Sequence, residues 1–270
     1  LHNLVPETND LVYRGNFKQA YLRLSKTHCF PEFTSRVCPA LCEAACTCGL
    51  NGDPVTVKEN EWAIIEKAYD QGVACPNPPS IRTGKKVAVI GSGPAGLTCA
   101  GDLCRLGYAV TVFEAFHTAG GVLMYGIPEF RLPKSIVQEE IDALKSAGVD
   151  IRTNMVIGKT LSLDELFDEG FDAVFIGSGA GLPSFLGIPG EGLLGVLSAN
   201  EFLTRVNLMK AYREEYDTPV KHARHVVVVG GGNVAMDAAR CAKRLGAESV
   251  TVIYRRGEEE MPARLEEIHH

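Results

Sequence analysis

The chain has 270 residues, of which 46% are hydrophobic and 22% are charged, and its formal net charge is −6. This composition is typical of a globular protein of about two domains, and the acidic balance argues against nucleic acid as the main partner. The longest apolar runs have only the length of a strand, and no basic stretch followed by an apolar one opens the sequence. We therefore expect no membrane span, no secretory signal and a cytoplasmic protein.

The first 78 residues or so read as helical and irregular. An amphipathic pattern over Asn9–Ser25 predicts a helix, and a second helix is predicted over Lys58–Gln71. The run Pro76-Asn77-Pro78-Pro79 predicts a stiff linker.

From Lys85 onward, strand and helix patterns alternate. This alternation predicts an α/β fold with two Rossmann-like dinucleotide-binding units, each built on a parallel sheet. We expect a helical iron–sulfur domain over 1–79, an FAD-binding domain over 80–198 and the start of an NADP(H)-binding domain over 199–270. Because the last unit holds only one strand–helix–strand repeat, the chain looks truncated. The predicted strands are Val87–Ile90, Ala109–Phe113, Val149–Thr153, Ala173–Ile176, Val226–Val229 and Val250–Tyr254, and the helices are Pro94–Leu106, Ile136–Ala147, Ser162–Glu169, Leu193–Asn207 and Val234–Leu245.

A glycine-rich turn, Gly91-Ser92-Gly93-Pro94-Ala95-Gly96, follows the first of these strands. In a dinucleotide fold the first glycine permits the tight turn, the second lets the backbone approach a pyrophosphate, and the third lets the helix pack against the strand. Glu114 ends the next strand, where an acid would hold ribose hydroxyls. The alternative is a purely structural turn followed by a surface glutamate.

A second turn of this kind, Gly230-Gly231-Gly232-Asn233-Val234-Ala235, follows the strand Val226–Val229. Its next strand ends in Arg255 and Arg256 rather than in an acid. Arginines can clamp a 2′-phosphate through charge-assisted hydrogen bonds, so the pattern favours NADP(H) over NAD(H). The alternative is a pair of solvated arginines.

Nine cysteines are unevenly placed, with five of them within 20 residues. Cys38, Cys42 and Cys46 recur every four residues around a proline, which suits an iron–sulfur cluster better than zinc. Cys29 and Cys48 are further candidate ligands by proximity alone. The alternative is a set of small hydrophobes on one helical face. We expect the scattered cysteines to be core thiols; they are Cys75, Cys99, Cys104 and Cys241.

Several segments together resemble the small (beta) subunit of NADPH-dependent glutamate synthase. The electron-input half of dihydropyrimidine dehydrogenase and the large subunit of NADH-dependent ferredoxin:NADP oxidoreductase share this plan. The resemblance covers nearly the whole chain, and its most specific part is Gly120–Lys134. The segments are Asn9–Gly15, Phe30–Pro39, Gly91–Gly96, Gly120–Lys134 and Tyr254–Arg264.

The resemblance implies that NADPH reduces FAD, and that electrons then pass singly through 4Fe-4S clusters to a partner, the large (alpha) subunit or another redox protein. It places FAD at Gly91, Gly93, Pro94, Ala95, Gly96, Glu114, Gly121, Arg131 and Gly179, and NADPH at Gly230, Gly232, Asn233, Val234, Ala235, Arg255 and Arg256. Cys38, Cys42 and Glu61 would serve one cluster, and Cys46 the other. The family's remaining cluster cysteines and its last flavin-binding strand have no counterpart in this sequence.

Hydride transfer between nicotinamide and flavin needs no acid or base from the protein, so no catalytic residue is predicted. Three other functions remain open. The first is the sister ferredoxin:NADP oxidoreductase, and the second is a nucleotide-binding electron-transfer module without turnover. The third is a disulfide reductase that would use Cys99 and Cys104, although their helix is predicted to face the sheet.

Overall fold

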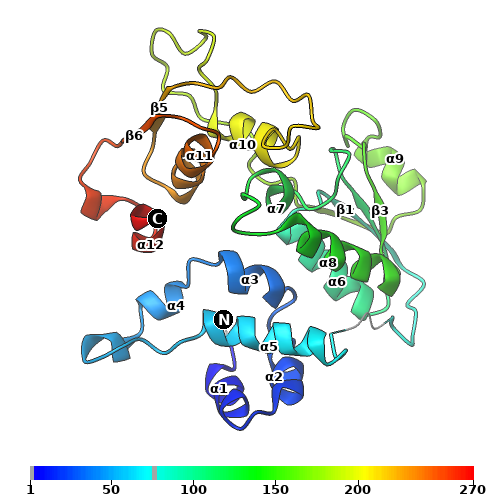
Figure 1. Ribbon diagram of the computed structural model, residues 1–270. Coiled ribbons are helices and arrows are strands. Elements are labelled where there is room, and N and C mark those ends of the chain that lie inside the picture. The colour runs from blue at the N-terminus through cyan, green and yellow to red at the C-terminus, as the bar shows by residue number, and fades with distance from the viewer. Residues whose placement is uncertain (1–2, 75–77) are drawn as a thin grey trace. The chain divides into compact units, whose positions relative to one another are not determined.

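The computed structural model describes residues 3–74 and 78–270, so Cys75 and the Pro76-Asn77 part of the predicted linker lie outside the described residues. Contacts divide the chain into two compact units. Unit 1 combines Leu1–Ala119 with Ser135–Gly177, and unit 2 combines Gly120–Lys134 with Ser178–His270. Figure 1 labels most of the helices and strands of both.

The N-terminal part of unit 1 is helical, as predicted. Instead of one helix over Asn9–Ser25, however, two helices form, because Gly15 turns with a φ of 72° and the Asn16 side chain accepts a hydrogen bond from Gln19 N. The first two helices pack against the last one through a small apolar core. The elements are α1 (Val5–Tyr13), α2 (Phe17–Leu24), α3 (Pro31–Val37), α4 (Leu41–Ala44), the 3₁₀ turn η1 (Thr47–Leu50) and α5 (Lys58–Asp70).

A parallel four-stranded sheet forms the rest of unit 1, in the order β3-β2-β1-β4. Its strands are β1 (Lys86–Ile90), β2 (Ala109–Phe113), β3 (Asp150–Arg152) and β4 (Ala173–Ile176), and its helices are α6 (Pro94–Arg105), α8 (Lys134–Ala147) and α9 (Leu163–Asp168). Because all four strands run the same way, their carboxyl ends share one edge, where the first glycine-rich turn and Glu114 follow β1 and β2.

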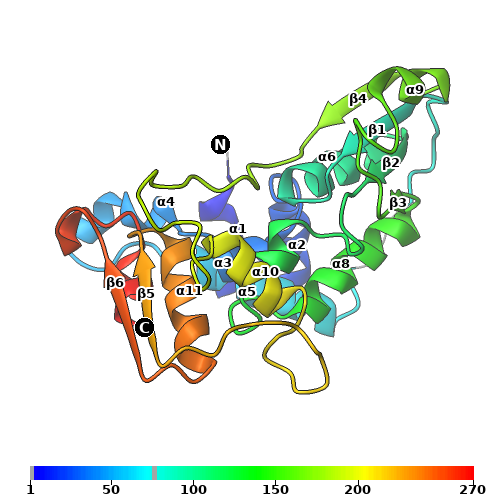
Figure 2. The ribbon, with the colours of Figure 1, turned by 90° about the horizontal axis from the view of Figure 1, so that it is seen from above.

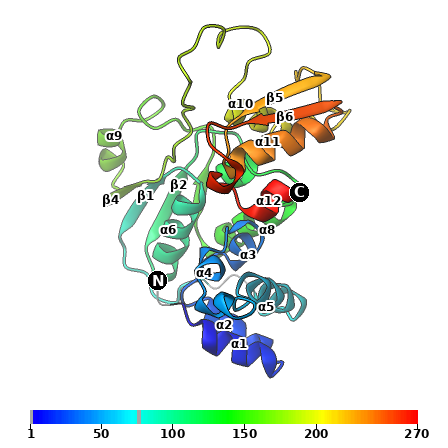
Figure 3. The ribbon, with the colours of Figure 1, turned by 90° about the vertical axis from the view of Figure 1, so that its left-hand side faces the viewer.

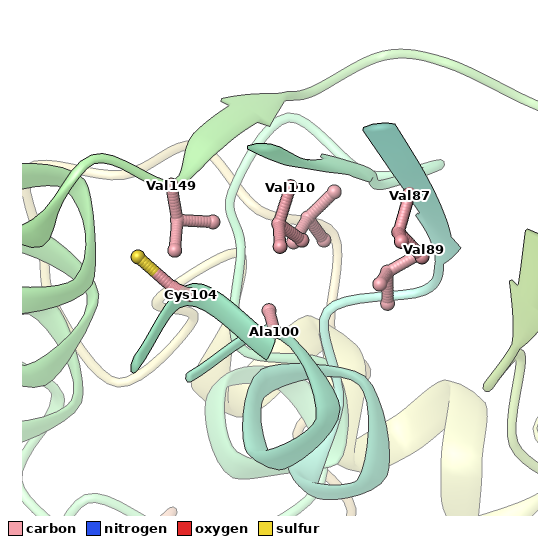
Figure 4. Packing of buried hydrophobic residues seen from close by; sticks show 7 residues of the cluster. Val87, Val89, Ala100, Cys104, Val110 and Val149 are labelled. Atoms are coloured by element: carbon pink, nitrogen blue, oxygen red, sulfur yellow. The ribbon is translucent and has the colours of Figure 1, made fainter. Parts of the chain in front are cut away.

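The core between this sheet and α6 is built from small and β-branched side chains. Valines of the central strands and Val149 pack against Ala100 and Cys104 of α6 (Figure 4). Figure 3 shows α6 lying along β1 and β2. The opposite face carries a second cluster that includes Phe113 and Leu166. Valine and alanine allow the close approach of helix and sheet that a nucleotide turn requires.

Unit 2 holds a two-stranded parallel sheet, β5 paired with β6. Figure 2 shows α11 running alongside both strands, and its buried face includes Met236 and Cys241. The helix predicted from Leu193 begins only at Ala199, because Ser198 Oγ accepts a hydrogen bond from Glu201 N and caps it there. The elements are α7 (Val122–Tyr125), α10 (Ala199–Asn207), β5 (His225–Val229), α11 (Asn233–Arg244), β6 (Ser249–Ile253), the 3₁₀ turn η2 (Glu258–Glu260) and α12 (Leu265–His269).

The structure confirms the predicted class, an α/β chain whose parallel sheets are preceded by a helical region. Among the helices of the described residues, none has both the length and the apolar character needed to cross a membrane.

Candidate functional site

The first glycine-rich turn joins β1 to α6. Gly91 has a φ of 96°, a conformation that favours glycine, and Pro94 is the first residue of the helix. A Cβ on Gly96 would lie 1.9 Å from the carbonyl oxygen of Gly91, whereas a Cβ on Gly93 would meet nothing within 4 Å. Gly96 therefore allows the close packing of helix on strand, and Gly93 and Ala95 leave open the space where the first N–H groups of α6 point.

Glu114 follows β2 and is 5% exposed. Its Oε2 atom accepts hydrogen bonds from Ser92 N, at 3.0 Å, and from Ser92 Oγ, and its Oε1 atom accepts one from Phe116 N, at 2.8 Å. The alternative of a surface glutamate is therefore wrong. A carboxylate has about four acceptor positions, so these three bonds leave room for a ribose hydroxyl. Sequence reasoning missed Ser92, whose contact with Glu114 spans two strands.

The second turn joins β5 to α11. Gly230 has a φ of 139°, and Asn233 is the first helical residue. Ala235 stands where the first turn has its third glycine, and a Cβ added to Gly230 would lie 3.5 Å from the Ala235 Cβ, at ordinary contact distance. A Cβ on Gly231 would lie 2.7 Å from the ring of Tyr254, so here glycine makes space for an aromatic side chain.

The segment after β6 folds back over this turn. Ala263 N donates to Gly231 O at 3.0 Å, and Arg264 N donates to Asn233 Oδ1 at 3.1 Å. Arg255 and Arg256 are exposed, and within the described chain neither forms an ion pair. Two guanidinium groups without an acidic partner therefore follow β6, the strand paired with β5, and guanidinium groups can bind a phosphate through charge-assisted hydrogen bonds.

The Gly120–Lys134 segment belongs to unit 2 by its contacts. Gly121, with a φ of 52°, precedes α7, and Gly179, with a φ of 70°, follows β4 in the chain. Arg131, which the resemblance places along the flavin, forms ion pairs with Asp237 at 2.7 Å and Glu267 at 3.1 Å. A flavin-binding role for Gly121, Arg131 and Gly179 stays a prediction.

Lys134, the last residue of this segment, binds the segment's own backbone through its side chain. Its Nζ donates to the carbonyl oxygens of Leu123, Ile127 and Leu132 at 2.8, 2.6 and 2.9 Å. Burial lowers the pKa of Lys134 to about 8, with partial compensation by nearby carboxylates. One ammonium group therefore holds three backbone carbonyls of the loop together.

The cysteine loop connects α3 to α5. Cys38 lies near enough to Cys42 for its charge to raise the pKa of Cys42, although burial is the larger cause. Cys46 and Cys48 are hydrogen-bonded through their sulfurs, and the N–H of Val55, which donates to Cys46 Sγ at 3.5 Å, lowers the pKa of Cys46. Cys38 thus lies near Cys42, and Cys46 near Cys48.

These thiols do not by themselves complete a cluster site. Over residues 3–74 and 78–270, no group of three or more His, Cys, Asp or Glu side chains could hold a metal ion. Glu61, on α5, is buried and bound to His28 Nε2 at 3.1 Å and to Thr34 Oγ1 at 3.5 Å. A four-ligand set is thus not assembled among the described residues, and metal roles for Cys38, Cys42, Cys46 and Glu61 stay predictions.

Glu43 is a positioning residue that sequence reasoning missed. Its Oε1 accepts hydrogen bonds from Val57 N and Lys58 N, both at 2.8 Å, and so caps the start of α5 in place of Val57 itself. This contact ties the loop around Cys42 to the helix that carries Glu61.

The scattered cysteines behave as core thiols where the structure describes them. Cys104 is buried in the sheet core (Figure 4), and its Sγ donates to Ala147 O at 3.4 Å. Burial raises the pKa of Cys241 to about 12. A redox pair of Cys99 and Cys104 is therefore not supported, since Cys104 lacks the exposed thiolate that such chemistry needs.

Comparisons with known proteins agree with this arrangement. Residues 1–73 match the family described as dihydropyrimidine dehydrogenase domain II, 4Fe-4S cluster. The chain is 44% identical to the glutamate synthase [NADPH] small chain of Mycobacterium tuberculosis, over 93% of this chain and 52% of that protein. It is 45% identical to the Bacillus subtilis glutamate synthase [NADPH] small chain, over 93% of this chain and 51% of that protein. The chain thus spans about half the length of these curated relatives.

A solved structure, Mycobacterium tuberculosis FprA in complex with NADPH, has a similar fold, with a TM-score of 0.57 at 25% identity, over 68% of this chain and 46% of that one. Residues 85–269, which contain both glycine-rich turns, match the family described as pyridine nucleotide-disulphide oxidoreductase. The match covers more than half of the sequence. The chain therefore belongs to the pyridine nucleotide-disulphide oxidoreductase family.

Proposed function

We propose that the protein carrying this chain oxidises NADPH at FAD and delivers the electrons to a partner, as the small subunit of a glutamate synthase. One contrast carries the proposal: the first turn is paired with the buried acid Glu114, and the second with the exposed Arg255 and Arg256. A carboxylate accepts hydrogen bonds from ribose hydroxyls, whereas a 2′-phosphate requires cations. The identity to glutamate synthase small chains supports the same assignment.

In this proposal the two turns divide the nucleotides between them. The helices that begin at Pro94 and Asn233 present their N-terminal N–H groups to the two pyrophosphates. FAD is bound by Gly91, Gly93, Pro94, Ala95, Gly96 and Glu114, with Gly121, Arg131 and Gly179 beside it. NADPH is bound by Gly230, Gly232, Asn233, Val234, Ala235, Arg255 and Arg256.

FAD, when bound, accepts a hydride and releases electrons one at a time. The chain's own residues need only hold the two nucleotides in the orientation that hydride transfer requires and exclude water. The match of residues 1–73 to a 4Fe-4S domain supports cluster binding in the complete protein. We assign Cys38, Cys42 and Glu61 to one cluster and Cys46 to another, and we assign electron delivery to the large subunit as partner.

Anaerobic titration of the complete protein with NADPH and with NADH, followed by flavin absorbance, tests the proposal. Replacing Arg255 and Arg256 with glutamine should weaken NADPH binding about ten- to a hundredfold, because hydrogen bonds to charged groups contribute about 1.5–3 kcal/mol. NADH binding should change little. The exposed Arg224, which pairs with Glu248, provides the matched Arg224→Gln control.

An equal loss for both nucleotides would refute the NADPH assignment. Co-purification of a glutamine amidotransferase chain would support glutamate synthase over the ferredoxin:NADP oxidoreductase. Absence of turnover with an artificial acceptor would favour the electron-transfer module instead. Two clusters require about eight iron atoms in the complete protein, and iron-free but active protein would remove the clusters from the proposal.

A further inference from the structure

Four charged side chains form a closed ring in unit 2, where three segments of the chain meet. Arg131 Nη1 contacts Asp237 Oδ2 at 2.7 Å, and its Nη2 contacts Glu267 Oε1 at 3.1 Å. Arg240 Nη2 contacts Asp237 Oδ1 at 2.8 Å and also contacts Glu267 Oε2. Each carboxylate thus bridges two guanidinium groups, and positive and negative charges alternate around the ring.

The ring is largely withdrawn from solvent. The four side chains are between 6% and 17% exposed, and their formal charges cancel. Buried ion pairs add little net stability because desolvation offsets the attraction, but removing one member leaves an uncompensated charge. Such a ring therefore favours one alignment of the segments that carry it over all others.

The neighbouring aromatic side chain reinforces the same junction. The ring of Phe130 lies 4.2 Å from the guanidinium carbon of Arg244 and 5.3 Å from that of Arg240. Cation–π contacts at these distances add to the attachment. Phe130 and Arg131 thus bind two successive turns of α11 from adjacent positions of the Gly120–Lys134 segment.

Side-chain hydrogen bonds connect several backbone positions of the segment to one another and to α10. Lys134 binds three of its carbonyl groups, and Asn207 Nδ2 donates to the carbonyl oxygens of Tyr125 and Gly126 at 3.4 and 3.2 Å. The contact pattern assigns the segment to unit 2, although in sequence it lies between β2 and β3 of the first sheet.

The ring also lies close to the second nucleotide turn along the chain. Asp237 is on α11, one helical turn after Asn233, where the helix begins. Glu267 is on α12, just after Arg264, whose N–H is bound by Asn233. The ring therefore joins the base of the nucleotide helix, the segment that covers its turn, and the Gly120–Lys134 loop.

We propose that Arg131, Asp237, Arg240 and Glu267 are positioning residues that fix the Gly120–Lys134 segment to the helix of the second nucleotide turn, so that both move as one body during hydride transfer. This inference rests on the proposed function, in which that segment lies along the flavin. It predicts that the ring governs the rate of hydride transfer more than the affinity for NADPH, since misplacement of about 1 Å can cost about a hundredfold in rate.

The test uses the complete protein with its cofactors and the variants Arg131→Gln, Asp237→Asn and the double variant. Arg213→Gln serves as the matched control, because Arg213 is exposed and pairs only loosely with Glu215, at 3.6 Å. Single-turnover mixing with NADPH measures the limiting rate of flavin reduction and, separately, the dissociation constant. Amide hydrogen exchange measures protection of residues 120–134 in each variant.

We expect the limiting rate to fall at least about tenfold in each single variant, with a change in the NADPH dissociation constant below about twofold. Exchange in residues 120–134 should accelerate about tenfold. The double variant should lose less than the product of the single effects, because each single change leaves an unpaired charge. Arg131→Lys keeps the charge but cannot contact both carboxylates at once, so its limiting rate should lie between that of the wild type and that of Arg131→Gln.

Unchanged exchange and unchanged rate in the Arg131 and Asp237 variants would overturn the proposal, and so would a loss confined to NADPH affinity. If NADPH does not reduce the flavin of the wild-type protein, the proposed function is refuted instead. In that case the exchange comparison still decides whether the ring holds the segment, because it needs no turnover.

Discussion

Glu32 offers a direct test of the electrostatics of unit 1. Its side chain lies on α3 and is only 4% exposed. One carboxylate oxygen, Oε1, contacts Arg36 Nη1 at 2.9 Å, while Oε2 has no hydrogen-bond partner among the described residues. Burial, opposed by Arg36 and reinforced by neighbouring carboxylates such as Glu66 and Glu140, raises the pKa of Glu32 to about 7.

The sign of the resulting pH dependence follows from this direction. Between about pH 4.5 and pH 7 the folded state binds a proton at Glu32 that the unfolded state has released, so stability falls as the pH rises through this window. A pKa shift of this size contributes about 3 kcal/mol to the free energy of unfolding. This contribution is fully present below the unfolded pKa of about 4.5 and is lost above the folded pKa of about 7. Glu32→Gln cannot lose a proton and should therefore escape the loss.

Urea unfolding of the wild type and of Glu32→Gln at several pH values measures this difference. From about pH 5 to about pH 8, the free energy of unfolding of the variant should rise relative to wild type by about 2 kcal/mol. Asp70→Asn is the matched control, because Asp70 is an exposed carboxylate of the same helical region that pairs with Lys67 at 3.1 Å. If the wild-type and Glu32→Gln curves stay parallel across this range, the burial argument for Glu32 is wrong.

Three other substitutions test the two turns and the cysteine loop. Gly96→Ala should lower the free energy of unfolding by about 1–3 kcal/mol, measured in urea, and abolish FAD binding, because the new Cβ would meet the Gly91 carbonyl oxygen. In Gly93→Ala the new Cβ meets open space, so this variant should keep its stability and lose only FAD affinity, measured by flavin content. Glu43→Ala should lower the free energy of unfolding by about 1 kcal/mol through loss of the α5 cap, and Glu43→Gln, which keeps an acceptor oxygen, should lose less; equal losses would show that the two backbone bonds do not matter. Gly231→Ala should displace the Tyr254 ring and weaken NADPH binding in titration while flavin content stays unchanged, so a loss of FAD would contradict the division of the two turns.

The sheets could be predicted well from sequence because their signals are local. Ala109–Phe113 and Ala173–Ile176 form strands with the predicted bounds, as short apolar runs next to turn residues indicate. The start of the helix at Ala199 was wrongly predicted at Leu193, although Ser198 and Glu201 form a capping pattern that outweighs the apolar residues before it. The same holds for Gly15 and Asn16, which divide the first helical pattern in two.

The remaining features depend on contacts that no local pattern encodes. Glu43 caps a helix 14 residues further along the chain, and Arg131 meets Asp237 across 106 residues. The bond between Ser92 and Glu114 joins the ends of two strands, so only their parallel pairing reveals it. Residue spacing alone predicted the two glycine-rich turns, but the residues that contact these turns are determined by the tertiary fold.

The discontinuous course of unit 2 has a practical consequence for dissecting this protein. A clone that began at Ser178 would contain β5, α11, β6 and α12 but would lack the inserted loop that supplies Phe130 and Arg131. The carboxylates of Asp237 and Glu267 would then lose two of their four guanidinium contacts and face water. Domain exchanges between related reductases should therefore transfer Gly120–Lys134 and Ser178–His270 together. Exchanging only one of them would combine α11 with a Gly120–Lys134 segment from another protein, whose side chains need not match the ion pairs.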